Sequence, residues 1–252
     1  MHLFEIIVVL HVIAGTTGLI AFWVPILTKK GAKNHRRWGR ICCYGFMAAG
    51  ALAIAMAMFS LYGPEERIPS VTDRVLFDGL FGWMMLYLGL LTIGFADYGL
   101  AVVKHSRKRE ALRAPRYQLL IAAVLISAAY CFYYGFGIGE LLMMAVALLG
   151  LAAMIIQQLY IWRKEAPTPQ SYVGEHFRAL IGMGISAYTA FMSVGLIRYI
   201  PEHVFNPLVW ALPSAVGVAL IIGFSLQAKR KTTPKSSKAA KPQPSKTRPT
   251  SA

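Results

Sequence analysis

Seven long apolar stretches run through this sequence, and the charge of the segments between them alternates along the chain. The stretches lie at residues 3–28, 41–62, 75–103, 117–136, 138–161, 177–200 and 206–227. A bilayer core about 30 Å thick is crossed by a helix of about 20 apolar residues, because each residue adds about 1.5 Å. Each stretch is long enough for one crossing. The sequence therefore predicts an all-α fold, a polytopic membrane bundle of seven transmembrane helices.

The basic residues collect in every second connection. The connection KKGAKNHRRWGR, after the first stretch, holds six basic residues and no acidic one, and KHSRKREALRAPR, after the third, holds six basic residues and one acidic residue. Lys and Arg accumulate on the cytoplasmic side of membrane proteins. We therefore expect the N-terminus outside and the C-terminus in the cytoplasm. Residues 1–227 form the predicted seven-span domain, and residues 228–252, with eight basic residues, form a predicted disordered cytoplasmic tail.

Composition agrees with a membrane protein and bears on its partners. The chain is 56% hydrophobic and 15% charged, and its net charge is +15. On a soluble protein such a charge would suggest nucleic-acid binding, but here it is confined to the connections, so no nucleic acid is expected as a partner. The expected partners are the lipid bilayer and anionic lipids at its cytoplasmic face. A homo-oligomer is left open.

His11 is the main candidate for a functional residue inside a span. It lies eight residues into the first stretch, and Gly15 and Gly18 share its helical face, so we expect it to point into the bundle. Ionisable residues at membrane depth are costly and often functional. One hypothesis is a haem b held by His11, with Met84 or Met192 as the second axial ligand. The structural alternative is a neutral histidine hydrogen-bonded within the bundle.

A second group of candidates gathers at the predicted cytoplasmic edge. Its members are ionisable residues from different spans: His35, His105, His176 and Asp97. Three histidines and a carboxylate can hold zinc or another divalent ion, with water as the remaining ligand, as in a metal-dependent membrane hydrolase. No HxxxH or HExxH spacing places two of them on one helix, so their meeting depends on packing. Interfacial histidines without a ligand are the alternative.

Two further hypotheses use other combinations of charged and ionisable residues. A proton-coupled transporter could use His11 and Asp97 as protonatable stations, although an ion pair between Asp97 and Lys104 is the structural alternative. A site for an anionic headgroup or phosphate could be formed by four arginines that flank the histidines: Arg36, Arg37, Arg40 and Arg178. Near other helix ends, the Glu140 carboxylate is expected to interact favourably with the positive N-terminus of a helix. Gln157 and Gln158 are expected to form hydrogen bonds between helices.

Two of these segments resemble a known family. The run HVIAGTTGLIAFWVPILTKKGAKNHRRWGR, residues 11–40, resembles a group of bacterial membrane proteins, the domain of unknown function 2306 family. The run GEHFRAL, residues 174–180, is similar to that family's third histidine element, but the usual Trp-Met pair after the histidine is absent. The resemblance implies a multi-pass protein of a bacterial inner membrane and singles out His11, His35, Arg36 and His176. It brings no established reaction. A fainter similarity to cytochrome b561-type bundles supports the haem hypothesis.

Overall fold

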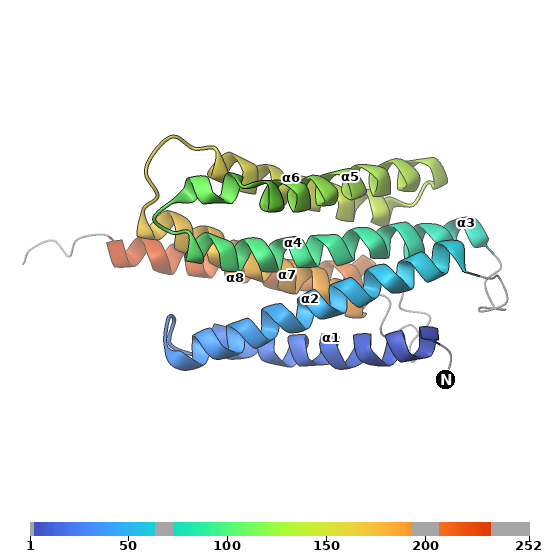
Figure 1. Ribbon diagram of the computed structural model, residues 1–252, viewed down its shortest axis with the longest axis horizontal. Coiled ribbons are helices and arrows are strands. Elements are labelled where there is room, and N and C mark those ends of the chain that lie inside the picture. Colours follow the sequence, from blue (N-terminus) through green and yellow to red (C-terminus); the bar gives the residue numbers. More distant parts are fainter. Residues whose placement is uncertain (1–2, 64–72, 193–206, 233–252) are drawn as a thin grey trace, which may run out of the picture.

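The structure is a computed structural model that describes residues 3–63, 73–192 and 207–232, and the regular structure in these ranges is helical (Figure 1). The helices are α1 (Leu3–Leu27), α2 (Lys33–Tyr62), α3 (Arg74–Phe77), η2 (Asp78–Met84), α4 (Met85–Lys104), η3 (Arg109–Arg113), α5 (Pro115–Ile138), α6 (Leu141–Ile161), α7 (Pro169–Ala190) and α8 (Pro207–Thr232). The helix η2 is a short π-helix that joins α3 to α4, and η3 is a 3-10 turn. The predicted all-α fold is confirmed.

Six helical segments of the described ranges are long and apolar enough to cross a membrane. They are Leu3–Leu27, Lys33–Tyr62, Arg74–Lys104, Pro115–Ile138, Leu141–Ile161 and Ala211–Ala228. The stretch predicted at 177–200 corresponds to α7, which is not among the six, and residues 193–200 lie outside the described ranges. Seven spans therefore stay a prediction.

Several helix boundaries differ from the apolar stretches. Helix α2 begins at Lys33 rather than at residue 41, and α7 begins at Pro169 rather than at 177. Long basic side chains can reach water from a part of the helix that lies outside the hydrocarbon, so hydropathy alone places the start of the helix too late. Thr168 sets the start of α7, because its side chain accepts a hydrogen bond from the backbone N–H of Ser171. Helix α8 continues to Thr232, five residues into the predicted tail, and residues 233–252 lie outside the described ranges.

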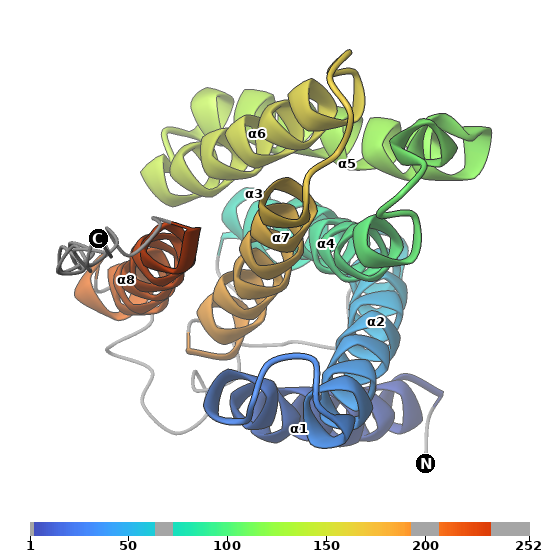
Figure 2. The same ribbon diagram turned by 90° about the vertical axis from the view of Figure 1, so that its left-hand side faces the viewer.

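Helix α4 lies at the centre of the bundle. It packs against α2, α5 and α7, while α1 lies on α2, α6 on α5 and α8 on α7 (Figure 2). About 67% of the most apolar window of Arg74–Lys104 is buried inside the protein, against 17% for α1 and 11% for Ala211–Ala228. The outer helices therefore leave most of their apolar surface unburied within the chain, which is compatible with membrane spans.

Small residues bring α2 and α4 into backbone contact. A Cβ added to Gly50 would lie 2.9 Å from the carbonyl oxygen of Gly89, and one added to Gly89 would lie 2.7 Å from that of Gly50. Helices in lipid associate through close packing and hydrogen bonds, since hydrocarbon gives no hydrophobic drive between them. The buried hydroxyls of Thr92 and Ser186 add such a bond between α4 and α7, 3.1 Å long.

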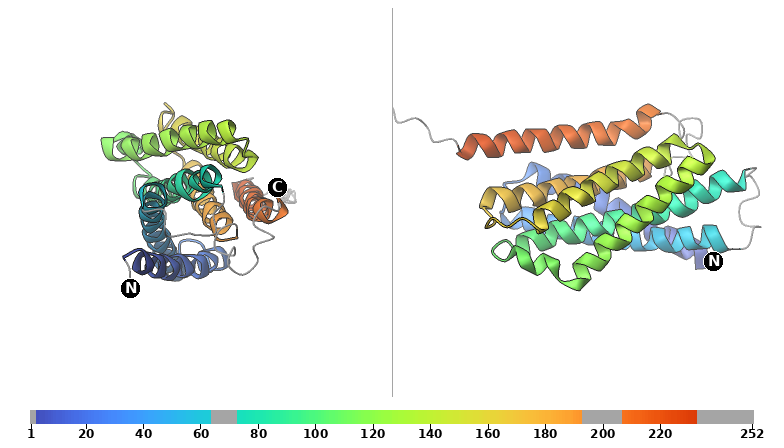
Figure 3. Two further views of the ribbon diagram at one scale, coloured as in Figure 1. Left: turned by 90° about the vertical axis from the view of Figure 1, so that its right-hand side faces the viewer. Right: turned by 90° about the horizontal axis from the view of Figure 1, so that it is seen from above.

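The basic connections lie at one end of the bundle, as the view from above also shows (Figure 3). The α1–α2, α4–α5 and α6–α7 connections and the C-terminal end of α8 all lie at the left of Figure 1, whereas the α5–α6 turn and the start of α1 lie at the right. We call the left-hand end, with residues 28–40, 104–116 and 162–168, the basic end. This arrangement agrees with the alternation predicted from the sequence.

Two expectations about polar residues are confirmed. Glu140 caps α6, since its carboxylate accepts a hydrogen bond from the backbone N–H of Leu142. Gln158 Nε2 donates to Gln118 Oε1 at 2.8 Å, which ties α6 to α5. Gln157 is buried, but its Oε1 has no hydrogen-bond partner among the described residues.

Candidate functional site

His35 and His176 meet at the basic end. His35 lies in the first turn of α2 and His176 near the start of α7, and their ring centroids are 6.4 Å apart with an interplanar angle of 62°. The helical pattern explains why both rings face inward. Cys42, seven residues after His35, and Met183, seven residues after His176, are both buried. Packing therefore brings together two of the four predicted metal ligands.

Backbone carbonyls fix the orientation of both rings. His35 Nδ1 lies 3.1 Å from the carbonyl oxygen of Pro25, and His176 Nδ1 lies 2.7 Å from that of Gly99. Pro25 lies in the last turn of α1, where carbonyl groups lack helical partners. A carbonyl oxygen only accepts, so Nδ1 is the donor in each ring. In the neutral form the proton is then on Nδ1, and Nε2 carries a free lone pair.

This arrangement is typical of histidine prepared to bind a metal. Metal-ligating histidines usually donate their second ring N–H to a backbone carbonyl or a carboxylate, which fixes the tautomer and the ring direction. Here two rings from different helices share that feature. In the part of the chain that the structure describes, no group of three or more His, Cys, Asp or Glu side chains is placed to hold a metal ion. A metal at this pair would need further ligands from water or from a bound molecule.

The other two predicted ligands lie in separate interactions. His105 Nε2 is 3.1 Å from the hydroxyl of Tyr117, and Asp97 Oδ1 accepts a bond of 2.7 Å from Arg116 Nη2. The predicted pairing of Asp97 with Lys104 is wrong, because α5 brings Arg116 to the carboxylate. Neither His105 nor Asp97 joins the histidine pair.

A buried carboxylate lies next to the pair and was missed in the sequence. Glu175 is 4% exposed, its Oε2 accepts a hydrogen bond of 2.9 Å from the hydroxyl of Tyr98, and its Oε1 lies 2.5 Å from Arg178 Nη2. The run GEHFRAL contains a signal for this ion pair. Glu175 directly precedes His176, and Arg178 follows Glu175 at i+3. Arg178, predicted to bind an anionic headgroup, is thus paired within the protein.

The remaining predicted headgroup residues lie on the surface of α2. Arg36, Arg37 and Arg40 are exposed, on faces of the helix other than the one that buries His35 and Cys42. These three side chains therefore do not face the pair.

The packing around His11 does not fit a haem. His11 Nδ1 is bonded to the carbonyl oxygen of Ala49 at 2.9 Å. Helices α1 and α2 are in direct contact immediately next to this bond, on the side toward the basic end. A Cβ added to Gly45 would lie 3.2 Å from the carbonyl oxygen of Ala14, and one added to Gly18 would lie 2.5 Å from the Phe46 ring. At this level the two helices are too close together for a porphyrin to fit between them.

The two methionines considered as partners of His11 lie elsewhere. Met84 is fully buried in η2, which packs against α2 and α5. Met192 lines a groove whose nearest α1 residues are Phe22 and Trp23. Trp23 is twelve residues beyond His11, about 18 Å along the helix. These positions favour the structural interpretation of His11, a neutral side chain bonded inside the bundle.

The chain matches no family model, no curated protein and no solved structure. The resemblance to the domain of unknown function 2306 family stays a prediction. What the site does must therefore be inferred from its residues.

Proposed function

We propose that this chain is a multi-pass protein of the bacterial inner membrane that binds a divalent transition-metal ion through His35 and His176 at the cytoplasmic face. The observation that carries the proposal is the pair of inward rings, each held at Nδ1 by a backbone carbonyl, with centroids 6.4 Å apart. Neutral imidazole nitrogen is a ligand suited to zinc, copper and nickel.

The surroundings of the pair support a bound cation. The Glu175 carboxylate offsets the charge of Arg178 beside the pair, and the exposed arginines of α2 lie on other faces of the helix. With only two protein ligands, the ion keeps positions open for water or a substrate, as catalytic metal sites do. A metal-dependent hydrolase at the cytoplasmic face is the activity that such open positions favour, and it uses His35 and His176 without His105 or Asp97.

Metal titration of the full-length protein in mild detergent tests the proposal. We expect Cu²⁺ or Zn²⁺ to bind at one site, and His35→Ala and His176→Ala each to weaken binding by about tenfold or more, since each removes one of two ligands. His105→Ala is the matched control, because its ring bonds Tyr117 outside the pair. Binding in that variant should equal that of the unchanged protein.

Two results would overturn the proposal. Equal affinity in the unchanged protein, His35→Ala and His176→Ala would show that the pair is not the site. A Soret absorption band in the purified protein, lost in both variants, would assign the pair to haem iron instead of a solvated ion. Metal analysis and a visible spectrum on the same sample separate these outcomes.

A further inference from the structure

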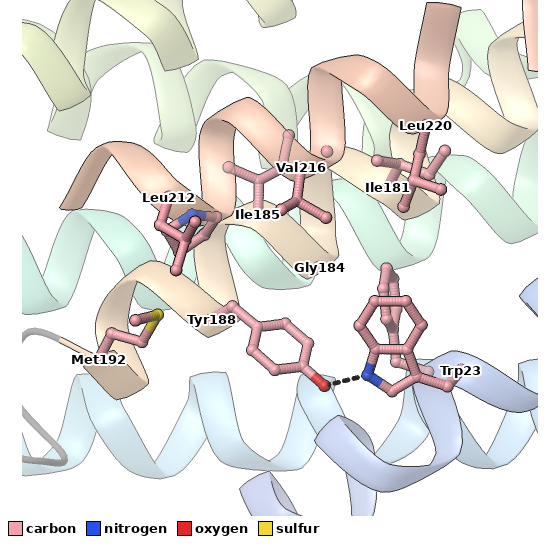
Figure 4. Close-up of a pocket in the computed structure, with 12 residues that line it drawn as sticks. Trp23, Ile181, Gly184, Ile185, Tyr188, Met192, Leu212, Val216 and Leu220 are labelled. Carbon is pink, nitrogen blue, oxygen red and sulfur yellow. Dashed lines mark hydrogen bonds between the residues drawn. The ribbon is translucent and has the colours of Figure 1, made fainter. Parts of the chain in front are cut away.

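An apolar groove runs between α7 and α8 and is closed on one side by α1 (Figure 4). It has a volume of about 140 Å³. Its lining includes Trp23 from α1, Ile185 and Tyr188 from α7, and Leu212, Val216 and Leu220 from α8. The groove lies outside the histidine pair and has no part in the function proposed above.

The polar atoms that reach this groove already have partners. Trp23 Nε1 donates to the Tyr188 hydroxyl at 2.7 Å, a bond drawn in Figure 4, and that hydroxyl donates to the carbonyl oxygen of Leu19 at 2.9 Å. The other lining side chains are hydrocarbon or thioether. A polar ligand would lose its hydration here without gaining bonds, so the groove suits a hydrocarbon chain.

The groove opens toward the surface that faces lipid. Leu212 is 53% exposed and Val216 is 42% exposed, and both lie in the candidate span Ala211–Ala228. The medium around such a span is the acyl chains of the bilayer. The molecule with direct access to the groove is therefore a lipid.

A cation marks the basic end of the groove. One turn after Leu220, the Phe224 ring packs edge-on against Phe177, with centroids 6.0 Å apart, and Lys30 Nζ lies 4.7 Å from the centroid of Phe224. Lys30 Nζ donates to the carbonyl oxygens of Pro25 and Ile26. An ammonium group has three N–H donors, so one remains for another acceptor.

We propose that the groove holds one acyl chain of an anionic phospholipid from the cytoplasmic leaflet, with the headgroup phosphate at Lys30. The groove lining runs from Ile181 of α7 to Met192, which are eleven residues and about 16 Å of helix apart. That is close to one leaflet of a hydrocarbon core of about 30 Å. An apolar channel of one-leaflet length that ends at a cation is complementary to such a lipid. The inference rests on the membrane placement proposed above but not on the metal.

Photo-crosslinking tests the position of the chain. The full-length protein is placed in nanodiscs with phosphatidylglycerol that carries a diazirine in one acyl chain, and labelled peptides are mapped by mass spectrometry. We expect labels on the groove residues of α7 and α8. Val216→Trp fills the groove and should remove these labels. Val218→Trp is the matched control, since Val218 is 50% exposed on α8 but does not line the groove.

A competition experiment tests the headgroup. We expect phosphatidylglycerol to label the groove in preference to phosphatidylcholine, and Lys30→Ala to reduce this preference by about fivefold, the weight of one cation near the membrane surface. Lys29→Ala, at a neighbouring exposed cation, should leave it unchanged.

Three results would overturn the proposal: labels spread evenly around α8, labelling that survives Val216→Trp, or equal labelling by the two lipids. Each variant is first compared with the unchanged protein by thermal unfolding, and Lys30→Ala keeps the test valid if Val216→Trp fails to fold. His35→Ala should label as the unchanged protein does. That control separates failure of this site from failure of the metal proposal.

Discussion

At the scale of single residues, the Glu175 carboxylate ties α7 to the central helix. Tyr98 on α4 donates to one oxygen, and Arg178 pairs with the other. Glu175→Ala would leave the buried Tyr98 hydroxyl without its partner, at a cost of about 1–3 kcal/mol of stability. We expect a lower midpoint of thermal unfolding in detergent. Glu110→Ala, at an exposed carboxylate, is the control, and equal midpoints in the two variants would contradict this role.

Metal binding by the histidine pair should depend on pH. A proton taken up by imidazole occupies the nitrogen that would bind the metal, so protons compete with the metal ion. The affinity of the unchanged protein for Zn²⁺ should therefore fall as the pH drops from 7.5 to 5.5, and rise again when the pH is restored. Calorimetric titration at both values measures it. A flat profile would point to ligands other than histidine.

Several side-chain contacts of single residues could not be predicted from the sequence. His35 and His176 were both candidates, but their meeting depends on how α2 and α7 are rotated and placed beside each other. Spacing along one helix predicts Lys104 as the partner of Asp97, while the partner in the structure, Arg116, comes from α5. Glu175 is buried because α7 packs against Tyr98 of α4, a contact that the local sequence does not contain. Tertiary packing decided each case.

At the scale of helices, the contact of α2 with α4 depends on two glycines. Gly89→Ala would place a methyl group 2.7 Å from the carbonyl oxygen of Gly50 and 2.8 Å from the Ile54 side chain. Overpacking of this kind costs about 1–3 kcal/mol, and thermal unfolding of the purified variant should show the loss.

Gly137→Ala is the matched control for this contact. Gly137 lies in the last turn of α5, where an added Cβ would meet nothing within 4 Å. Alanine favours helix by up to about 1 kcal/mol over glycine, so this variant should be as stable as the unchanged protein or more so. If Gly89→Ala were equally stable, α2 and α4 would not be in backbone contact.

The helices themselves were the most predictable feature. Within the described residues, each of the seven apolar stretches is mainly helical, because a long apolar run in a chain of this composition has few other stable forms. Helix starts were less predictable. The basic segment before residue 41 and the cap at Thr168 extend α2 and α7 for reasons that hydropathy does not contain.

At the scale of the whole molecule, the collection of basic connections at one end predicts which side is cytoplasmic. A cysteine placed at Lys164 should react with a membrane-impermeant maleimide only after cells are broken, and one placed at Gly137 should react in intact cells. The three native cysteines are buried, so background labelling should be low. Labelling in the reverse order would invert the orientation and move the histidine pair to the outer face.

The central position of α4 has a consequence for how the chain is made. Every later long helix packs against at least one already synthesised: α2 against α1, α4 against α2, α5 against α4, α6 against α5, α7 against α4 and α8 against α7. The bundle can therefore assemble in the order in which the ribosome releases it. His176 lies in α7. A nascent chain that ends before this helix therefore contains the earlier helices but only one of the two histidines, His35.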